Sequence, residues 1–127
     1  MKLYFAPPSP FARKARTVII EKNLQDRVET VAVNPLEDPP ELLAANPLGK
    51  IPALVCEDGT ALLDSPLVCA YLDSLSPAPR LHLPHGAGHF AQQRRLALID
   101  GLLDAAVAAR MEALRPAERQ HAPWVER

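Results

Sequence analysis

The sequence of 127 residues predicts an α/β domain with a four-stranded mixed sheet, followed by a helical segment. Three observations support this fold class. Short apolar runs alternate with stretches of helical periodicity in the first half of the chain, as they do in βαβ units. An Asp-Gly pair at residues 58–59 separates two further short apolar runs and indicates a β-hairpin. A long helical pattern then follows a stretch rich in Pro, His and Gly.

The first half predicts a βαβ unit, whose crossover is expected to be right-handed. Residues 2–5 form the first strand, which ends before two prolines. Ser9 and Pro10 are residue types favoured at the N-cap and at the first position of a helix. Residues 28–33, a short run rich in β-branched residues, form the second strand. The apolar stripe of the intervening helix comprises Phe11, Ala15, Val18 and Ile19.

The second half predicts a hairpin covered by a helix. Ser65 and Pro66 repeat the cap-and-proline pattern and open a second long helix. The apolar stripe of that helix comprises Leu67, Tyr71, Leu72 and Leu75. The elements before it are a loop (34–40), a short helix (41–45) and antiparallel strands at 53–56 and 60–63.

Residues 77–89 predict a linker, and residues 90–127 predict part of a helical domain. A long helix is expected over 90–115, ended by Pro116, and a further helix starts near residue 122. The apolar side of the long helix is wide for a helix without partners, and it comprises Leu96, Ile99, Leu103, Val107 and Leu114. We therefore expect this segment to be poorly packed in isolation.

Composition excludes several classes of function. The formal net charge is −1, so neither nucleic acid nor an anionic membrane is expected as a partner. No apolar run approaches the roughly 20 residues of a transmembrane helix, and the N-terminal apolar run is too short for a signal peptide. The two cysteines, Cys56 and Cys69, are too few for a disulfide framework, and we expect both to be buried. A cytoplasmic location follows as the expectation.

Residues 46–52, with the sequence Asn-Pro-Leu-Gly-Lys-Ile-Pro, are the candidate binding stretch. Pro52 stands where a strand begins, which suits a residue without an N–H group. An X-Pro bond also adopts the cis form far more readily than other peptide bonds. A cis bond here would leave the N–H and C=O groups of Ile51 free to pair with an extended, peptide-like ligand. The alternative is an ordinary loop in which Pro47 and Gly49 make a turn.

Two predicted helix starts, at Ser9 and Ser65, flank this stretch. A helix N-terminus binds anions because its first N–H groups are unpaired and it carries about half a positive charge. In a fold of this order both starts lie at the carboxyl ends of strands, on one rim of the sheet. The rim would suit a ligand with a carboxylate at one end, a peptide backbone in the middle and a thiolate at the other end.

Three motifs in this order resemble those of the glutathione S-transferase family. They are Ser9-Pro10-Phe11, the stretch 46–52, and Asp64-Ser65-Pro66 with Tyr71-Leu72 downstream. The Ser-Pro-Phe start is most similar to a bacterial subgroup. The resemblance covers the family's thioredoxin-like N-terminal domain (residues 1–76), the linker, and the start of the helical second domain. It implies a β-α-β-α-β-β-α domain followed by a truncated all-α domain, in a fragment or short form of a longer protein.

The resemblance implies a glutathione site on the rim. The backbone of Ile51 would pair with the cysteinyl unit, and Pro52 would be the family's cis-proline. Asp64 and Ser65 would hold the γ-glutamyl end, with Ser65 giving its hydroxyl and its backbone N–H to the carboxylate. Lys50 would reach the glycyl carboxylate.

Ser9 matches the position of the family's catalytic hydroxyl or thiol. Its Oγ–H would stabilise the glutathione thiolate, and so lower a thiol pKa that is ordinarily about 8.5. It would do so as a hydrogen-bond donor and would not itself become the nucleophile. The alternative is that Ser9 serves only as an N-cap. Asp100 matches a position from which some family members reach glutathione across a dimer interface, and the alternative there is a solvated helix residue.

The resemblance implies a dimeric transferase of detoxification, which activates the glutathione thiolate for attack on a small electrophile. One alternative is a glutathione-dependent disulfide reductase, which would rely on the sulfur of glutathione because the chain has no Cys-x-x-Cys. Another is a catalytically silent module for protein interaction. No metal is expected: His82, His85 and His89 are close in sequence but lie in the linker without a cysteine ligand.

Overall fold

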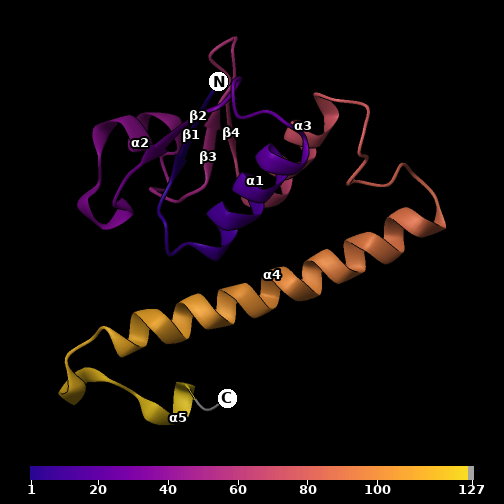
Figure 1. The fold of residues 1–127 in the computed structure, drawn as a ribbon. Helices are drawn as coiled ribbons and strands as arrows, with labels where there is room; N and C mark the ends of the chain where they lie inside the picture. Colours follow the sequence, from indigo (N-terminus) through magenta and orange to yellow (C-terminus); the bar gives the residue numbers. More distant parts are fainter. Residues whose placement is uncertain (126–127) are drawn as a thin grey trace. The chain divides into compact units, whose positions relative to one another are not determined.

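The computed structural model describes residues 1–125, and the chain divides into two compact units, Met1–Leu83 and Pro84–Arg127 (Figure 1). The predicted thioredoxin-like order of strands and helices is confirmed. The first unit contains β1 (Lys2–Phe5), α1 (Pro10–Glu21), β2 (Glu29–Ala32), η1 (Pro35–Glu37), α2 (Pro40–Ala45), β3 (Ala53–Val55), β4 (Ala61–Leu63) and α3 (Ser65–Ser74). The second contains α4 (Ala87–Ala113), η2 (Ala117–Arg119) and α5 (Ala122–Val125).

The four strands form one mixed sheet in the order β2-β1-β3-β4. β1 is parallel to β2, and β3 is antiparallel to both β1 and β4. β1 and β4 therefore run in the same direction, and α1 and α3, which follow them, start at the same rim. Ala53 at the start of β3 pairs with Tyr4 on one side and Leu63 on the other, so Pro52 stands at that rim too. The predicted placement of both helix starts on one rim is confirmed.

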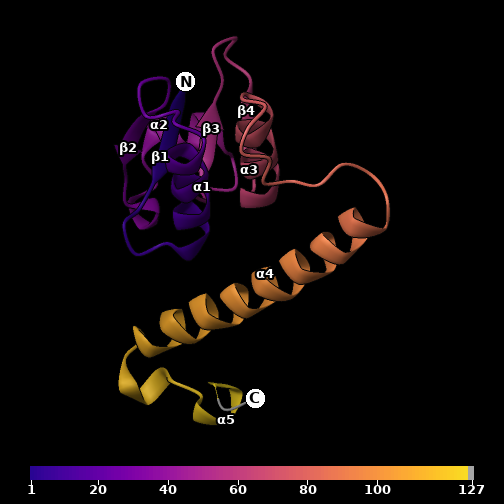
Figure 2. The same cartoon turned by 45° about the vertical axis from the view of Figure 1, so that its right-hand side comes forward.

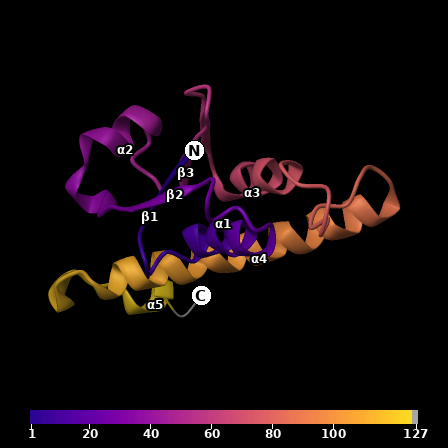
Figure 3. The same ribbon diagram turned by 45° about the horizontal axis from the view of Figure 1, so that its top comes forward.

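Helices cover both faces of the sheet (Figures 2 and 3). On one face, α1 and α3 pack over Leu3 and Leu54, which are opposite each other in the sheet and fully buried. On the other face, α2 packs its Leu42 and Ala45 against Tyr4 and Ala53. The predicted burial of Cys56 and Cys69 in the first of these cores is confirmed.

The start of α3 differs from the prediction. Asp64, not Ser65, is the N-cap, because its carboxylate accepts the hydrogen bond of the Ser65 N–H at 2.7 Å. Ser65 is consequently the first helical residue, and its side chain is fully buried. The predicted apolar stripe was wrong at Leu67, which is 52% exposed; Val68 faces the core instead. The buried positions of α3 then follow the helical period, and they are Ser65, Val68, Cys69, Leu72 and Asp73.

A similar shift of one position occurs in α1, where Phe11 is only half-buried and Ala12 is fully buried. The other members of the predicted stripe, namely Ala15, Val18 and Ile19, are buried as expected.

In the second unit, α4 begins at Ala87, inside the stretch expected to be linker, and none of its residues is buried. Its predicted stripe is only partly covered: Leu96, Leu103 and Val107 have intermediate exposure, whereas Ile99 is 46% and Leu114 is 56% exposed. Neither α4 nor any other helix in residues 1–125 is long and apolar enough to cross a membrane. Residues 126–127, the end of the last predicted helix, lie outside the described residues.

Candidate functional site

Ser9 caps α1 at the rim. Its Oγ accepts a hydrogen bond from the Ala12 N–H at 3.1 Å, and its C=O accepts one from the Arg13 N–H at 3.0 Å. The capping role is therefore present in the structure. Because Oγ acts as the acceptor in this bond, its own hydrogen remains available for donation. Capping and donation to a ligand are therefore compatible.

Asn46 organises the loop that leads to β3. This buried side chain donates from Nδ2 to the Lys50 C=O at 2.8 Å and accepts at Oδ1 from the Leu48 N–H at 3.0 Å. Its backbone C=O accepts from the N–H of Gly49, whose φ of +63° is readily adopted only by glycine. The predicted turn and the predicted strand start thus occur together. Sequence analysis missed this role of Asn46, although an Asn-Pro-x-Gly pattern is a turn signal.

Ile51 and Pro52 carry the predicted cis peptide bond, which is confirmed. Pro52 is buried and Ile51 is half-buried, directly before the paired part of β3. Within residues 1–125, neither the N–H nor the C=O of Ile51 takes part in a hydrogen bond. Ile51 thus offers one donor and one acceptor at the rim. The side chain of Lys50 beside it is exposed.

Asp64 and Ser65 form the third part of the rim. Asp64 has φ +70° and ψ +140°, a conformation that L-residues rarely adopt and that costs on the order of 1–3 kcal/mol. The Ser65 hydroxyl is enclosed and has no hydrogen-bond partner in the described part of the chain. An unpaired buried polar group costs roughly 1–3 kcal/mol. Backbone strain and an unpaired hydroxyl at the same point indicate a site that a ligand completes.

Together these residues make a rim with a defined chemistry. The N-termini of α1 and α3 favour negative charge, and the backbone of Ile51 between them matches a peptide unit. The sheet register brings together Ser9, Ile51, Pro52, Asp64 and Ser65, with Lys50 adjacent. Asp100 lies half-buried on α4, in the second unit.

The three predicted linker histidines form no metal centre among residues 1–125, which contain no group of three or more His, Cys, Asp or Glu able to hold a metal ion. His82 lies beside Asp73, and the distance from His82 Nδ1 to Asp73 Oδ2 is 3.3 Å. The rings of His85 and His89 contact each other at an interplanar angle of 50°, with their centroids 5.3 Å apart.

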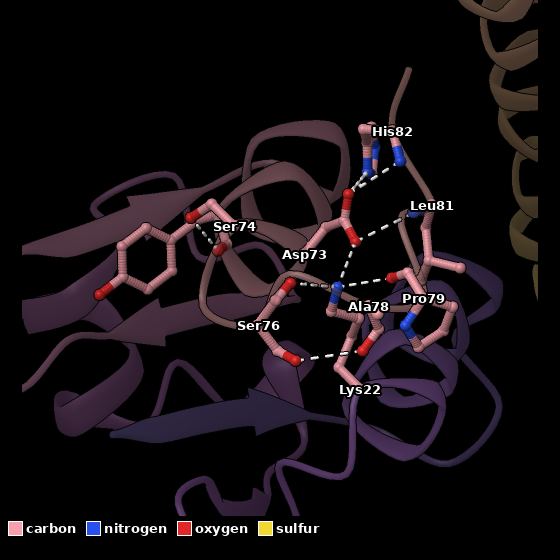
Figure 4. Close-up of polar contacts among 9 residues, drawn as sticks. Lys22, Asp73, Ser74, Ser76, Ala78, Pro79, Leu81 and His82 are labelled. Atoms are coloured by element: carbon pink, nitrogen blue, oxygen red, sulfur yellow. Dashed lines mark hydrogen bonds and ion pairs between the residues drawn. The ribbon is translucent and has the colours of Figure 1, made fainter. Parts of the chain in front are cut away.

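A polar cluster that sequence analysis missed lies at the far ends of α1 and α3 from the rim (Figure 4). Lys22, whose side chain is fully enclosed, forms an ion pair with Asp73 at 2.9 Å. Its Nζ also donates to the carbonyls of Ser76 and Pro79, each at 2.6 Å. A surface hollow next to this cluster is lined in part by Asp73 and His82. That hollow is at the opposite end of α3 from Ser65, so it does not mark the rim.

Asp73 is held ionised by its neighbours. Burial raises the pKa of its carboxyl, but hydrogen bonds from Lys22, Leu81 and His82 outweigh burial and bring the pKa down to about 2. The Leu81 and His82 bonds come from backbone N–H groups at 3.1 and 2.8 Å. The segment from Ser76 to His82 is therefore held against the C-terminal ends of α1 and α3.

Comparisons with known proteins agree on one family. Residues 8–75 match the model described as "Glutathione S-transferase, N-terminal domain". The chain is 35% identical over 121 residues to the "Uncharacterized GST-like protein YibF" of Escherichia coli (strain K12), covering 94% of this chain and 58% of that protein.

Solved structures are similar across nearly the whole chain. A glutathione transferase family member from Pseudomonas fluorescens Pf-5, with bound glutathione, matches with a TM-score of 0.92 and 34% identity, covering 98% of this chain and 62% of its own. A glutathione S-transferase from Methylobacillus flagellatus KT, with glutathione bound, matches with a TM-score of 0.89 and 42% identity, covering 98% and 61%. The chain thus spans about three fifths of the length of these relatives.

Proposed function

The chain belongs to the glutathione S-transferase family, and we propose that it binds glutathione along the rim where α1, β3 and α3 begin. The observation that carries this proposal is the unpaired hydroxyl of Ser65, enclosed at the first turn of α3 beside the strained Asp64. The relatives crystallised with glutathione give independent support.

The γ-glutamyl end of glutathione carries an ammonium group and a carboxylate, which suit Asp64 and Ser65. In the structure, the Asp64 carboxylate accepts the hydrogen bond of the Ser65 N–H. On binding, the ligand's carboxylate takes over this N–H and the Ser65 hydroxyl, while the Asp64 carboxylate turns to the ligand's ammonium. One carboxylate replaces another, so the N-terminus of α3 keeps its favourable negative charge throughout.

The middle of the ligand pairs with Ile51. The free N–H of this residue donates to the cysteinyl C=O and its free C=O accepts from the cysteinyl N–H, as in pairing with an added strand. Pro52, which has no N–H to donate, lies next to these two groups of Ile51. Lys50 directly precedes Ile51 in the chain, and its ammonium pairs with the glycyl carboxylate.

Ser9 then acts on the sulfur. Its Oγ–H donates to the thiolate, which is further favoured by the N-terminus of α1, so that the thiol ionises at a lower pH. The thiolate forms the new bond to an electrophilic carbon, and the leaving group departs with its electron pair. The thiol releases its proton to solvent, and Ser9 stabilises the charge on sulfur without taking that proton.

By analogy with the longer family members, the proposal has three further parts. The second substrate is a small electrophile, the protein is a homodimer in which Asp100 contacts the partner's glutathione, and its role is detoxification in the cytoplasm. The disulfide reductase and the silent interaction module are the competing functions. Turnover of an aromatic halide against turnover of a glutathione-accessible disulfide separates the transferase from the reductase.

Titration calorimetry of reduced glutathione into the full chain tests the site. Ser65→Ala removes the unpaired hydroxyl and is expected to weaken binding by about tenfold, the value of one hydrogen bond to a charged group. Ser74→Ala is the matched control, because this exposed serine lies at the other end of α3 and its Oγ donates only to the Tyr71 C=O. Equal affinity of wild type and Ser65→Ala would refute the assignment, and no binding by wild type would favour the silent module.

A further inference from the structure

The two helices that supply the rim also pack against each other. α1 and α3 start at the rim, run in the same direction and share one apolar core. α1 contributes Ala15, Val18 and Ile19 to this core, and α3 contributes Val68, Cys69 and Leu72. The distance between Ser9 and Ser65 therefore depends on how these two helices are set against each other.

Their shared apolar surface fixes that setting less sharply than directional bonds do. Apolar contact is non-directional and scales with the area removed from water. A hydrogen bond, by contrast, weakens once its atoms move by a few tenths of an ångström or its angle falls below about 120°.

Lys22 and Asp73 supply such a directional contact. Lys22 is the C-cap of α1 and Asp73 lies in the last turn of α3, so the pair joins the two helices at the end opposite the rim. The three ammonium hydrogens of Lys22 have three acceptors, namely one Asp73 oxygen and the carbonyls of Ser76 and Pro79. Every donor is used, so the ammonium has one favourable position.

Asp73 is equally constrained. Beside Lys22 it accepts from the backbone N–H groups of Leu81 and His82, and its side chain is only 7% exposed (Figure 4). A buried ion pair is costly to desolvate and is weak support for stability, so its best-attested use is to fix one arrangement among several. Here the arrangement is that of α1 against α3.

We propose that Lys22 and Asp73 are positioning residues for glutathione, because they set the spacing of the α1 and α3 N-termini from the far end of both helices. This inference rests on the proposed function of the rim. It assigns Lys22 and Asp73 no contact with the ligand. They act on Ser9 and Ser65 indirectly, because they fix the position of α1 relative to α3.

The test uses the full chain with both partners neutralised, Lys22→Met with Asp73→Asn. Glutathione affinity is measured by calorimetry, and stability by urea unfolding. The distance between the helix starts is measured without ligand, by pulsed electron resonance between spin labels on Arg13→Cys and Leu67→Cys. Both labelled positions are exposed, whereas the native cysteines are buried. The control is Arg27→Met with Glu57→Gln, which removes an exposed ion pair of 3.4 Å.

We call the double variant Lys22→Met with Asp73→Asn the clamp variant. We expect it to shift or broaden the label distance and to lose about tenfold in glutathione affinity, since sites tolerate only about 0.5 Å of misplacement. The control is expected to change neither. Wild-type distances in the clamp variant would overturn the proposal, whether or not affinity falls. If the double variant does not fold, Asp73→Asn alone is judged by the same two readings. Absence of glutathione binding by wild type would refute the proposed function. The label distances would still decide whether the Lys22–Asp73 pair sets the spacing of the two helix starts.

Discussion

The carboxylate of Asp64 accepts the hydrogen bond of the Ser65 N–H at 2.7 Å, while the hydroxyl of Ser65 has no partner within residues 1–125. The same short segment thus contains a donor that is already satisfied and a polar group that is not. Asp64 holds this arrangement at a positive φ of 70°. A ligand carboxylate that approaches α3 must compete with the Asp64 carboxylate, and this competition makes Asp64 testable apart from Ser65.

Asp64→Asn is expected to weaken glutathione binding by about tenfold, because the amide no longer attracts the ligand's ammonium group. Asparagine is as good an N-cap as aspartate and keeps an oxygen acceptor for the Ser65 N–H, so unfolding free energy should change little. Asp58→Asn is the matched control, since the Asp58 carboxylate likewise accepts a nearby N–H, that of Thr60 at 2.9 Å, but in the exposed hairpin turn. Calorimetry that gives the two variants the same affinity would contradict the role of Asp64.

Ser9→Gly is expected to leave glutathione affinity nearly unchanged and to raise the pKa of the bound thiol. Glycine is an acceptable N-cap and costs only a few tenths of a kcal/mol, so loss of the hydroxyl is separated from loss of the cap. Ser9→Thr, which keeps both cap and donor, should restore the wild-type pKa. Ultraviolet absorbance of the thiolate against pH gives the measurement. An unchanged thiol pKa in Ser9→Gly would leave Ser9 with its capping role alone.

Local signals explain what could be predicted from the sequence. The Ser9 cap, the hairpin at Gly59 and the strand start after Pro52 each depend on residues a few positions apart. The cap of α3 was harder, because Asp64 and Ser65 are both good N-cap residues and adjacent. Burial of the Ser65 side chain against the core decides between them, and no local pattern reports that burial.

The Lys22–Asp73 pair had no local signal at all. The two residues are far apart in the chain, and each on its own reads as a charged residue near a helix end, which is ordinarily solvated. Only the packing of α1 on α3 brings them together. For the same reason residues 77–82 were predicted to be linker, although backbone groups of Pro79, Leu81 and His82 bond to Lys22 and Asp73.

Asn46→Ala is expected to destabilise the first unit by about 2 kcal/mol, because it leaves the Lys50 C=O and the Leu48 N–H without their buried partner. Glutathione affinity should fall as well, since the same loop presents Ile51. Asn34→Ala is a close control: Asn34 is exposed and makes similar local bonds, to Glu37 at 2.8 Å and from Leu36 at 3.2 Å. Urea unfolding that shows equal losses for the two variants would contradict the prediction.

The ion pair of Lys22 and Asp73 predicts how stability depends on pH. The folded-state pKa of Asp73, about 2, lies below its ordinary value of 3.8. A depressed pKa contributes stability that is fully present above pH 3.8 and is lost as pH falls through 2, here roughly 2 kcal/mol. Asp73→Asn cannot titrate, so its unfolding free energy should fall less steeply than that of wild type over this interval. Denaturant unfolding of both proteins at several pH values checks this, and parallel curves would show that Asp73 has an ordinary pKa in the folded protein.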